Sequence, residues 1–115
     1  ISPDVFKLIN HNITELDLSC NKIGIIKRDS LYYLPNLKVL LLNENKLTEL
    51  TNFTFINLQN LMYLDLNSNQ ISIIELNAFK GLAKLFMLYL YHNKIKYIKN
   101  GYFLDLENLN RLELY

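Results

Sequence analysis

Apolar residues recur along this chain at an unbroken spacing of 24 residues. Each unit has leucine or isoleucine at its first, fourth, sixth and eleventh positions, and asparagine at its ninth. The first position is held by Ile13, Leu37, Leu61, Leu85 and Leu109, and the ninth by Asn21, Asn45, Asn69 and Asn93. Such a period is typical of a solenoid, in which each unit packs on its neighbours, and excludes a globule with one central core. Because a solenoid displays an extended surface, the period favours a binding function.

The start of each unit alternates with period 2, which predicts a short strand with one buried face. In the second unit, for example, Leu40 and Leu42 point inward while Val39 and Leu41 point outward. The asparagine ends the strand, and we expect its amide to bond backbone groups of the following turn and of the next coil. The four asparagines should therefore form an internal ladder.

The second half of each unit is too short and too mixed for a long helix. We expect irregular or 3₁₀ backbone that carries Phe55, Phe79 and Phe103 into the core, with Leu31 in the first unit. This side is bulkier than the stacked strands, so the stack should curve with the strands inside. The whole chain, 1–115, then forms one segment: a partial repeat (1–12, with Ile1, Phe6 and Ile9 in core positions), four full repeats (13–36, 37–60, 61–84, 85–108) and a final strand (109–115).

The pattern LxxLxLxxNxIxxIxxxxFxxLxx resembles the leucine-rich repeat family in its 24-residue form. The match covers essentially the whole chain. It is similar to the repeats of Toll-like receptor ectodomains, leucine-rich-repeat hormone receptors, Slit-type guidance proteins and lamprey variable lymphocyte receptors. The resemblance implies an α/β solenoid: a right-handed horseshoe with parallel strands on its concave face. It also implies binding of protein or other ligands, usually outside the cell, with receptor dimerisation or a co-receptor as further partners.

Composition sets few limits on the partner. The net charge of +1 calls for neither a nucleic acid nor a membrane surface, so we expect a protein or peptide ligand rather than these. No apolar run approaches the roughly 20 residues that span a bilayer. The single cysteine, Cys20, cannot form an internal disulfide, and the cysteine-rich end caps that are usual in extracellular relatives are absent.

The outward positions of the strands are the candidate binding site. Nothing in the scaffold requires apolar residues there, yet they gather in the middle and later units, bordered by charges. An exposed apolar patch usually marks an interaction site. Alternatively, these side chains pack against one another across strands, or a neighbouring repeat covers them. The candidate ligand-binding residues are Val39, Leu41, Met62, Tyr63, Asp65, Phe86, Met87, Tyr89, Tyr91, Arg111 and Glu113.

A second candidate surface is lateral. Lys22, Lys46 and Lys94 follow the ladder asparagines, with Gln70 in the third unit. Toll-like receptors, which the chain resembles, often bind ligands on a lateral face, and stacked lysines suit an anionic ligand. The alternative is that these charges are simply solvated.

The sequence offers no catalytic, metal or cofactor site. Its three glycines form no phosphate-binding loop, and Cys20 and His92 occupy coils too far apart to act as nucleophile and base. His11 and His92 lack companions at metal-ligand spacing. We therefore expect a protein that is not an enzyme and needs no cofactor.

Two glycosylation sequons occur, at Asn12 and Asn52. About one is expected by chance in a chain so rich in asparagine, so the pair is weak support for secretion. A glycan on Asn52 would leave the concave face open, and Asn12 lies near the lateral edge.

The leading hypothesis is the ligand-binding segment of an extracellular leucine-rich-repeat receptor that recognises a protein or peptide on its concave aromatic surface. One alternative is an intracellular leucine-rich-repeat scaffold, which would explain the free cysteine. Another is an innate immune receptor segment that binds an anionic ligand on its lateral face. A third is a purely architectural segment, with the ligand bound elsewhere on the horseshoe.

Overall fold

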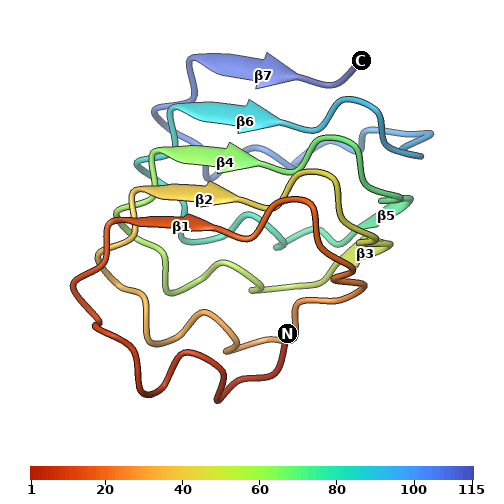
Figure 1. Cartoon of the computed structure of the whole chain (residues 1–115). Coiled ribbons are helices and arrows are strands. Elements are labelled where there is room, and N and C mark those ends of the chain that lie inside the picture. Colours follow the sequence, from red (N-terminus) through yellow and green to blue (C-terminus); the bar gives the residue numbers. More distant parts are fainter.

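The computed structural model describes residues 1–115 as a short solenoid whose strands stack along one side (Figure 1). Five parallel strands form one sheet in chain order. Facing residues differ by one period, as Val39 opposite Tyr63 and Tyr63 opposite Met87 show. The expected parallel-strand solenoid is confirmed. The sheet contains β1 (Glu15–Asp17), β2 (Val39–Leu41), β4 (Tyr63–Asp65), β6 (Met87–Tyr89) and β7 (Arg111–Glu113).

The inward residues of the middle strands form the core. Leu40, Leu64 and Leu88 are fully buried, whereas their strand neighbours Val39 and Leu41 are only half-buried. Burying one leucine side chain is worth about 1.5–3 kcal/mol. A slip of one residue would turn every inward leucine outward, so this alternation fixes the register of the sheet.

The side opposite the strands consists of turns and contains no helix. Its N–H groups bond the carbonyl three residues earlier, as from Leu58 to Phe55 (2.9 Å) and from Leu61 to Leu58 (3.1 Å). This is the bonding of isolated 3₁₀ turns, so the expected irregular convex backbone is present. Within it, the Phe55 and Phe79 rings stack with centroids 6.3 Å apart, and Phe79 and Phe103 at 5.7 Å.

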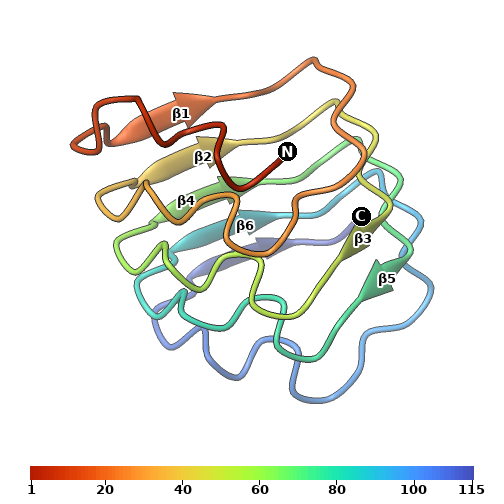
Figure 2. The same cartoon turned by 90° about the horizontal axis from the view of Figure 1, so that it is seen from below.

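A second, two-stranded sheet was not expected from the sequence. It pairs β3 (Glu49–Leu50) with β5 (Ile73–Ile74), where the chain turns away from the main sheet (Figure 2). Leu50 and Ile74 point into the core, and Ile73 points out with 54% of its surface exposed. Two-residue strands are too short to produce a readable alternation in the sequence.

The asparagines form a ladder, but it runs to the preceding coil and not to the next. The Asn45 amide Nδ2 donates to the Leu18 carbonyl (2.9 Å) and to the Leu42 carbonyl of its own coil (3.1 Å). Its Oδ1 accepts the Ile23 N–H at 3.0 Å. Asn69 and Asn93 repeat this arrangement one and two coils later. Each of these three amides therefore joins two coils through four backbone groups.

The first coil departs from the expectation at two positions. Asn21 is exposed and bonds only carbonyls of its own turn, Leu18 and Ser19, because no coil of this chain precedes it. Phe6 is buried, and Ile1 is tied to the first coil through its carbonyl, which accepts the Ser30 hydroxyl at 2.6 Å. The core position assigned to Ile9 is not seen in the structure, since Ile9 is 36% exposed.

Candidate functional site

The outward side chains of the five strands lie side by side on the strand face of the solenoid. Strand register places Tyr63 beside Met87, and Asp65 beside Tyr89. Most of these side chains are half-buried by their neighbours; Met62 and Phe86 remain 48% and 40% exposed. The structure thus brings the candidate residues of β2, β4, β6 and β7 together on one continuous surface, where they also pack on one another.

Three tyrosines form the centre of this surface. The Tyr63 and Tyr89 rings meet edge to face with centroids 5.4 Å apart, and Tyr89 and Tyr91 do so at 6.1 Å. The Tyr89 hydroxyl donates to the Met87 sulfur at 3.7 Å. Edge-to-face pairs of this kind hold the rings in fixed orientations. We refer to Tyr63, Tyr89 and Tyr91 as the tyrosine cluster.

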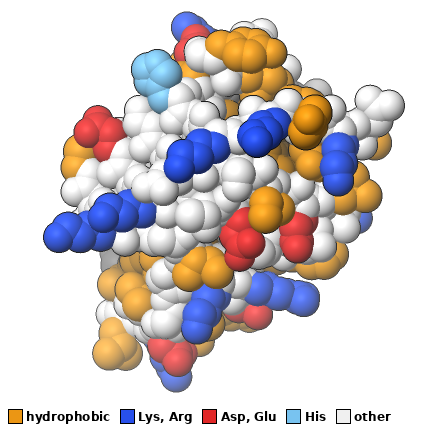
Figure 3. Space-filling view, turned by 90° about the vertical axis from the view of Figure 1, so that its right-hand side faces the viewer, with side chains coloured by type: hydrophobic (Ala, Val, Ile, Leu, Met, Phe, Trp, Pro, Cys, Tyr) orange, Lys and Arg blue, Asp and Glu red, His pale blue; other side chains and the backbone are white.

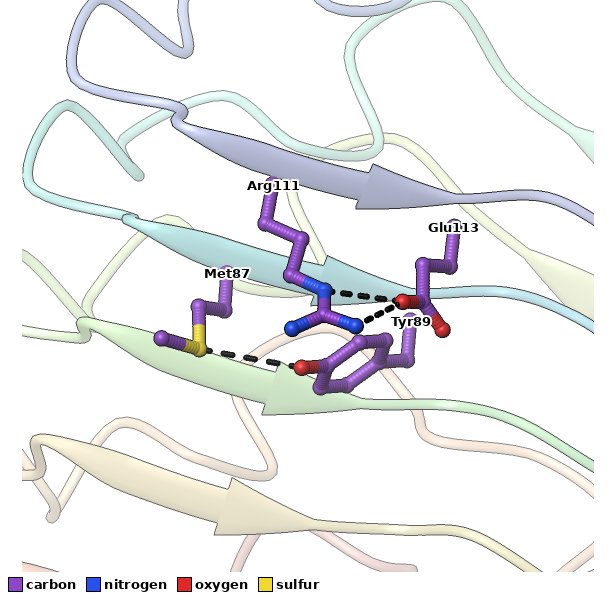
Figure 4. Close-up of polar contacts among 4 residues, drawn as sticks. All are labelled: Met87, Tyr89, Arg111 and Glu113. Carbon is purple, nitrogen blue, oxygen red and sulfur yellow. Dashed lines mark hydrogen bonds and ion pairs between the residues drawn. The ribbon is translucent and has the colours of Figure 1, made fainter.

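Arg111 covers one side of the tyrosine cluster. Its guanidinium carbon lies 5.6 Å from the centroid of the Tyr89 ring, and its Nε donates to Glu113 Oε1 at 2.8 Å (Figure 4). The hydrogen bonds to Glu113 raise the pKa of Arg111 above its usual value. This ion pair is exposed and screened by solvent, so its main effect is to hold the guanidinium over the ring.

An open groove of about 310 Å³ lies along the starts of β1, β2, β4 and β6. Five of its eight lining side chains are apolar, and Lys38 and Glu15 stand at its margin. We call it the apolar groove. It is lined by Thr14, Glu15, Lys38, Val39, Met62, Tyr63, Phe86 and Met87.

Asp65 lies on the outward side of β4 beside Tyr89, as the sequence predicts. The expectation that it is a fully solvent-exposed border charge is wrong, because only 9% of Asp65 is exposed. Its Oδ1 accepts the backbone N–H and the side-chain amide of Asn67 at 3.0 and 2.6 Å. Asp17 makes the same contacts with Ser19, but on an exposed strand without aromatic neighbours.

The strand face is more acidic than the rest of the molecule. Among its outward positions, Glu15, Asp17, Asp65 and Glu113 stand against Lys38 and Arg111, a net charge of −2 in a chain of net +1. Burial, and then the charge of Asp65, raise the pKa of both Tyr63 and Tyr91. Both phenols therefore remain neutral hydrogen-bond donors at physiological pH.

The lysine column lies on a different side of the solenoid. Lys22, Lys46 and Lys94 are exposed in the turns that follow the strands. None of them forms an ion pair, since Arg111–Glu113 is the one pair in the structure. Figure 3 shows the side on which these turns lie, where Lys and Arg side chains are spread widely.

The two sequon asparagines differ in their surroundings. Asn12 is exposed, whereas Asn52 is half-buried and its Oδ1 accepts the Asn77 N–H at 2.9 Å. Thr54, the third residue of the second sequon, is buried with its hydroxyl donating to the Thr51 carbonyl. In the folded state Asn12 is the more accessible acceptor.

Sequence reasoning missed a second row of amides, just before the strands. Asn36, Asn60 and Asn108 donate to the carbonyls of His11, Pro35 and Ala83 in the preceding coil. The spacing of 24 residues could have found this row, which lysine interrupts at position 84. Beside it, an open pocket of about 390 Å³ is lined by His11, Tyr32, Tyr33, Pro35, Asn36, Asn57, Gln59 and Asn60.

Two further features bear on chemistry. No group of three His, Cys, Asp or Glu side chains is placed to hold a metal ion. The Cys20 thiol donates to Glu44 at 3.5 Å, and this hydrogen bond raises its pKa, which lowers its reactivity as a nucleophile.

No helix is long and apolar enough to cross a membrane.

Comparison with known proteins identifies the repeat. The family model described as Leucine rich repeat matches residues 1–47 and 35–95, most of the chain. The chain belongs to the leucine-rich repeat family. Among curated proteins, no match to this chain was found.

Two solved structures of Toll-type receptors are similar to this chain. In the crystal structure of the TLR13–ssRNA13 complex, the matched chain is 39% identical with a TM-score of 0.86 over 88% of this leucine-rich repeat chain. The Toll–Spatzle complex of Drosophila matches 89% of it at 24% identity and a TM-score of 0.81, which shows the fold alone. This chain spans 14% of the length of each.

These two structures bear on the expected partners. One contains single-stranded RNA and the other a complex of Toll with Spatzle. The expectation that a nucleic acid partner is disfavoured is therefore not supported, since net charge alone cannot exclude a locally cationic face. Leucine-rich repeat and Toll-type families are typically non-catalytic.

Proposed function

We propose that this chain is a non-catalytic, ligand-binding segment of a Toll-like, leucine-rich-repeat receptor, and that it binds a protein or peptide through its strand face. The observation that carries the proposal is the tyrosine cluster and its adjoining apolar groove on one continuous surface. Tyr and Met are enriched at the centres of interfaces, where a few anchors can each contribute 2 kcal/mol or more. The strands that carry this surface are the most buried ones, so binding should cost little conformational entropy.

The proposed location and the proposed membership of a larger receptor are supported by the similarity of this chain to Toll-type receptor structures. A chain similar to the TLR13 and Toll structures would act in an extracellular or endosomal compartment, as part of a longer glycosylated receptor, with Asn12 as the favoured glycan acceptor. A receptor dimer or co-receptor would then complete the complex. The segmentation into a partial repeat, four full repeats and a final strand is part of this proposal.

The lysine column supports a second candidate function. Lys22, Lys46 and Lys94 are exposed and free of ion pairs, so they are available to an anionic ligand such as single-stranded RNA. The 39% identity with the TLR13 chain solved with single-stranded RNA favours this candidate. An anion would meet repulsion on the acidic strand face, so the two candidates use different surfaces.

The two methionines provide the test. Met62 and Met87 are the only methionines of the chain, and both line the apolar groove. In a chain labelled with ¹³C at its methionine methyl groups, two NMR signals report on the strand face, and Met62→Leu assigns them. A protein ligand should shift both signals. Binding of a protein ligand or of a single-stranded RNA oligonucleotide that shifts neither would exclude the strand face for that ligand.

A further inference from the structure

Asp65 is a nearly buried carboxylate without a counter-ion. It is 9% exposed, and the one ion pair of the structure joins Arg111 to Glu113 instead. Asn67 supplies two hydrogen bonds, both to Oδ1, whereas Oδ2 has no protein donor and is open to solvent. A partly buried charge is screened less by solvent and salt than a fully exposed one, so a cation that reaches Oδ2 is attracted to it. The strand face therefore contains a negative charge that a bound cation would stabilise.

Aromatic side chains surround this carboxylate. Tyr89 is its direct partner on β6, and Tyr63 precedes it by two residues on the same face of β4. The charge of Asp65 raises the pKa of Tyr63 and of Tyr91 after the larger effect of burial, which places both phenols within its electric field. A carboxylate framed by aromatic rings attracts an ammonium or guanidinium group, because ring faces and carboxylate are both negative.

Arg111 shows that the surface accepts such a group. Its guanidinium already lies against the Tyr89 ring, but Glu113 holds it on the β7 side. Asp65 lies on β4, on the other side of β6, and so remains without a cation. One cation site of the cluster is thus filled from within the chain, and the other is open to a ligand.

The apolar groove adjoins this open site. Tyr63 belongs to both, since it lines the groove and its ring packs on Tyr89. Residues 63 and 65 lie two apart on one face of β4, a separation of about 7 Å. A ligand that presents an apolar side chain to the groove and a basic one to Asp65 thus needs the two groups about 7 Å apart, the spacing of positions i and i+2 in an extended segment.

We propose that the strand face recognises an extended peptide segment in which an apolar residue and a lysine or arginine alternate, with the apolar side chain in the groove and the cation between Asp65 and the tyrosine cluster. This rests on the proposed function and specifies its ligand. The net charge of −2 across the outward positions agrees with a basic partner. The other groups that face the site, Arg111 and Glu113, neutralise each other.

The proposal is tested by panning a library of random displayed peptides on the immobilised chain. The enriched peptides are then measured against two variants that each remove one charge. Asp65→Asn keeps the Oδ1 acceptor for Asn67 and removes the charge. Asp17→Asn is the matched control, because it makes the same change in the same turn without tyrosines nearby. We expect enriched peptides to carry Lys or Arg two positions from an apolar residue. Their affinity should fall about tenfold or more in Asp65→Asn, at least 1.4 kcal/mol, and stay unchanged in Asp17→Asn.

The other outcomes separate the two proposals. Peptides without basic residues that still lose affinity in Tyr63→Ala would overturn the cation inference and leave the strand face as the binding surface. If the affinity of the enriched peptides changes in neither Asp65→Asn nor Tyr63→Ala, both proposals are overturned. The same holds if no peptide is enriched from the library. A melting temperature equal in Asp65→Asn and the unchanged chain confirms that any loss of affinity is not unfolding.

Discussion

The inner and outer sides of β4 differ in what their residues stabilise. On the inner side Leu64 is fully buried, and Asn69 beyond the strand end joins two coils through backbone hydrogen bonds. On the outer side the Tyr63 ring packs edge to face on the ring of the neighbouring outward residue Tyr89. The inner side therefore maintains the fold, and the outer side is free to vary with the ligand. This division explains how one repeat pattern can serve many binding functions.

The largest expected difference between the two sides is in packing. Leu64→Ala should lower the free energy of unfolding by about 2–5 kcal/mol, because it leaves a cavity in the core. Tyr63→Ala should lower it by less than about 1 kcal/mol, the value of a cross-strand pair. Urea unfolding followed by circular dichroism measures both. Similar losses in the two variants would contradict the division.

Hydrogen bonding gives the next largest effect. Asn69→Ala should cost about 1–3 kcal/mol of unfolding free energy, because it leaves buried backbone groups of two coils without partners. Asn43→Ala is the matched control on the outer side. Its side chain forms no hydrogen bond, so its loss should be close to zero. Equal losses at these positions would show that the inner and outer assignment of the turn is wrong.

The smallest expected effect concerns β7, where the inward and outward residues differ less in burial than they do in β4. Leu112, its inward leucine, is only half-buried, and β7 has one strand neighbour. Strands with an unpaired edge open readily. In the 115-residue chain we expect faster amide exchange at Leu112 than at Leu64, measured by NMR in deuterated water. Added repeats after Tyr115 should slow the exchange at Leu112, and equal rates without them would contradict this account.

The sequence predicted the buried leucines of the inner side. A buried leucine must recur wherever a coil returns to the core, so spacing alone placed Leu40, Leu64 and Leu88 and the turns around Phe55 and Phe79. It failed at the first coil, where Ile9 has the residue type of a core position but is 36% exposed.

The outer side was less predictable, because its contacts depend on side-chain packing that no period encodes. The spacing brought Tyr63, Met87 and Tyr89 together, but it treated Asp65 as an exposed charge. Asp65 is buried because large tyrosine side chains flank it, and the repeat period does not encode the packing of side chains on neighbouring strands. On the inner side, the ladder direction was not predicted either, because it depends on which neighbouring coil offers its carbonyl, as Leu18 does to Asn45.

The central claim is that the outer side of the strands binds the ligand. It is tested most directly by titrating the chain with a protein or peptide ligand that binds it, and comparing two sets of variants. Single changes Tyr63→Ala, Met87→Ala and Tyr89→Ala should each weaken binding by about 1–3 kcal/mol, or 5- to 150-fold in affinity. Replacing Lys22, Lys46 and Lys94 by Ser should change only its salt dependence. Loss of binding in the lysine set, with none in the outer-side set, would contradict the claim and assign the ligand to the lateral face.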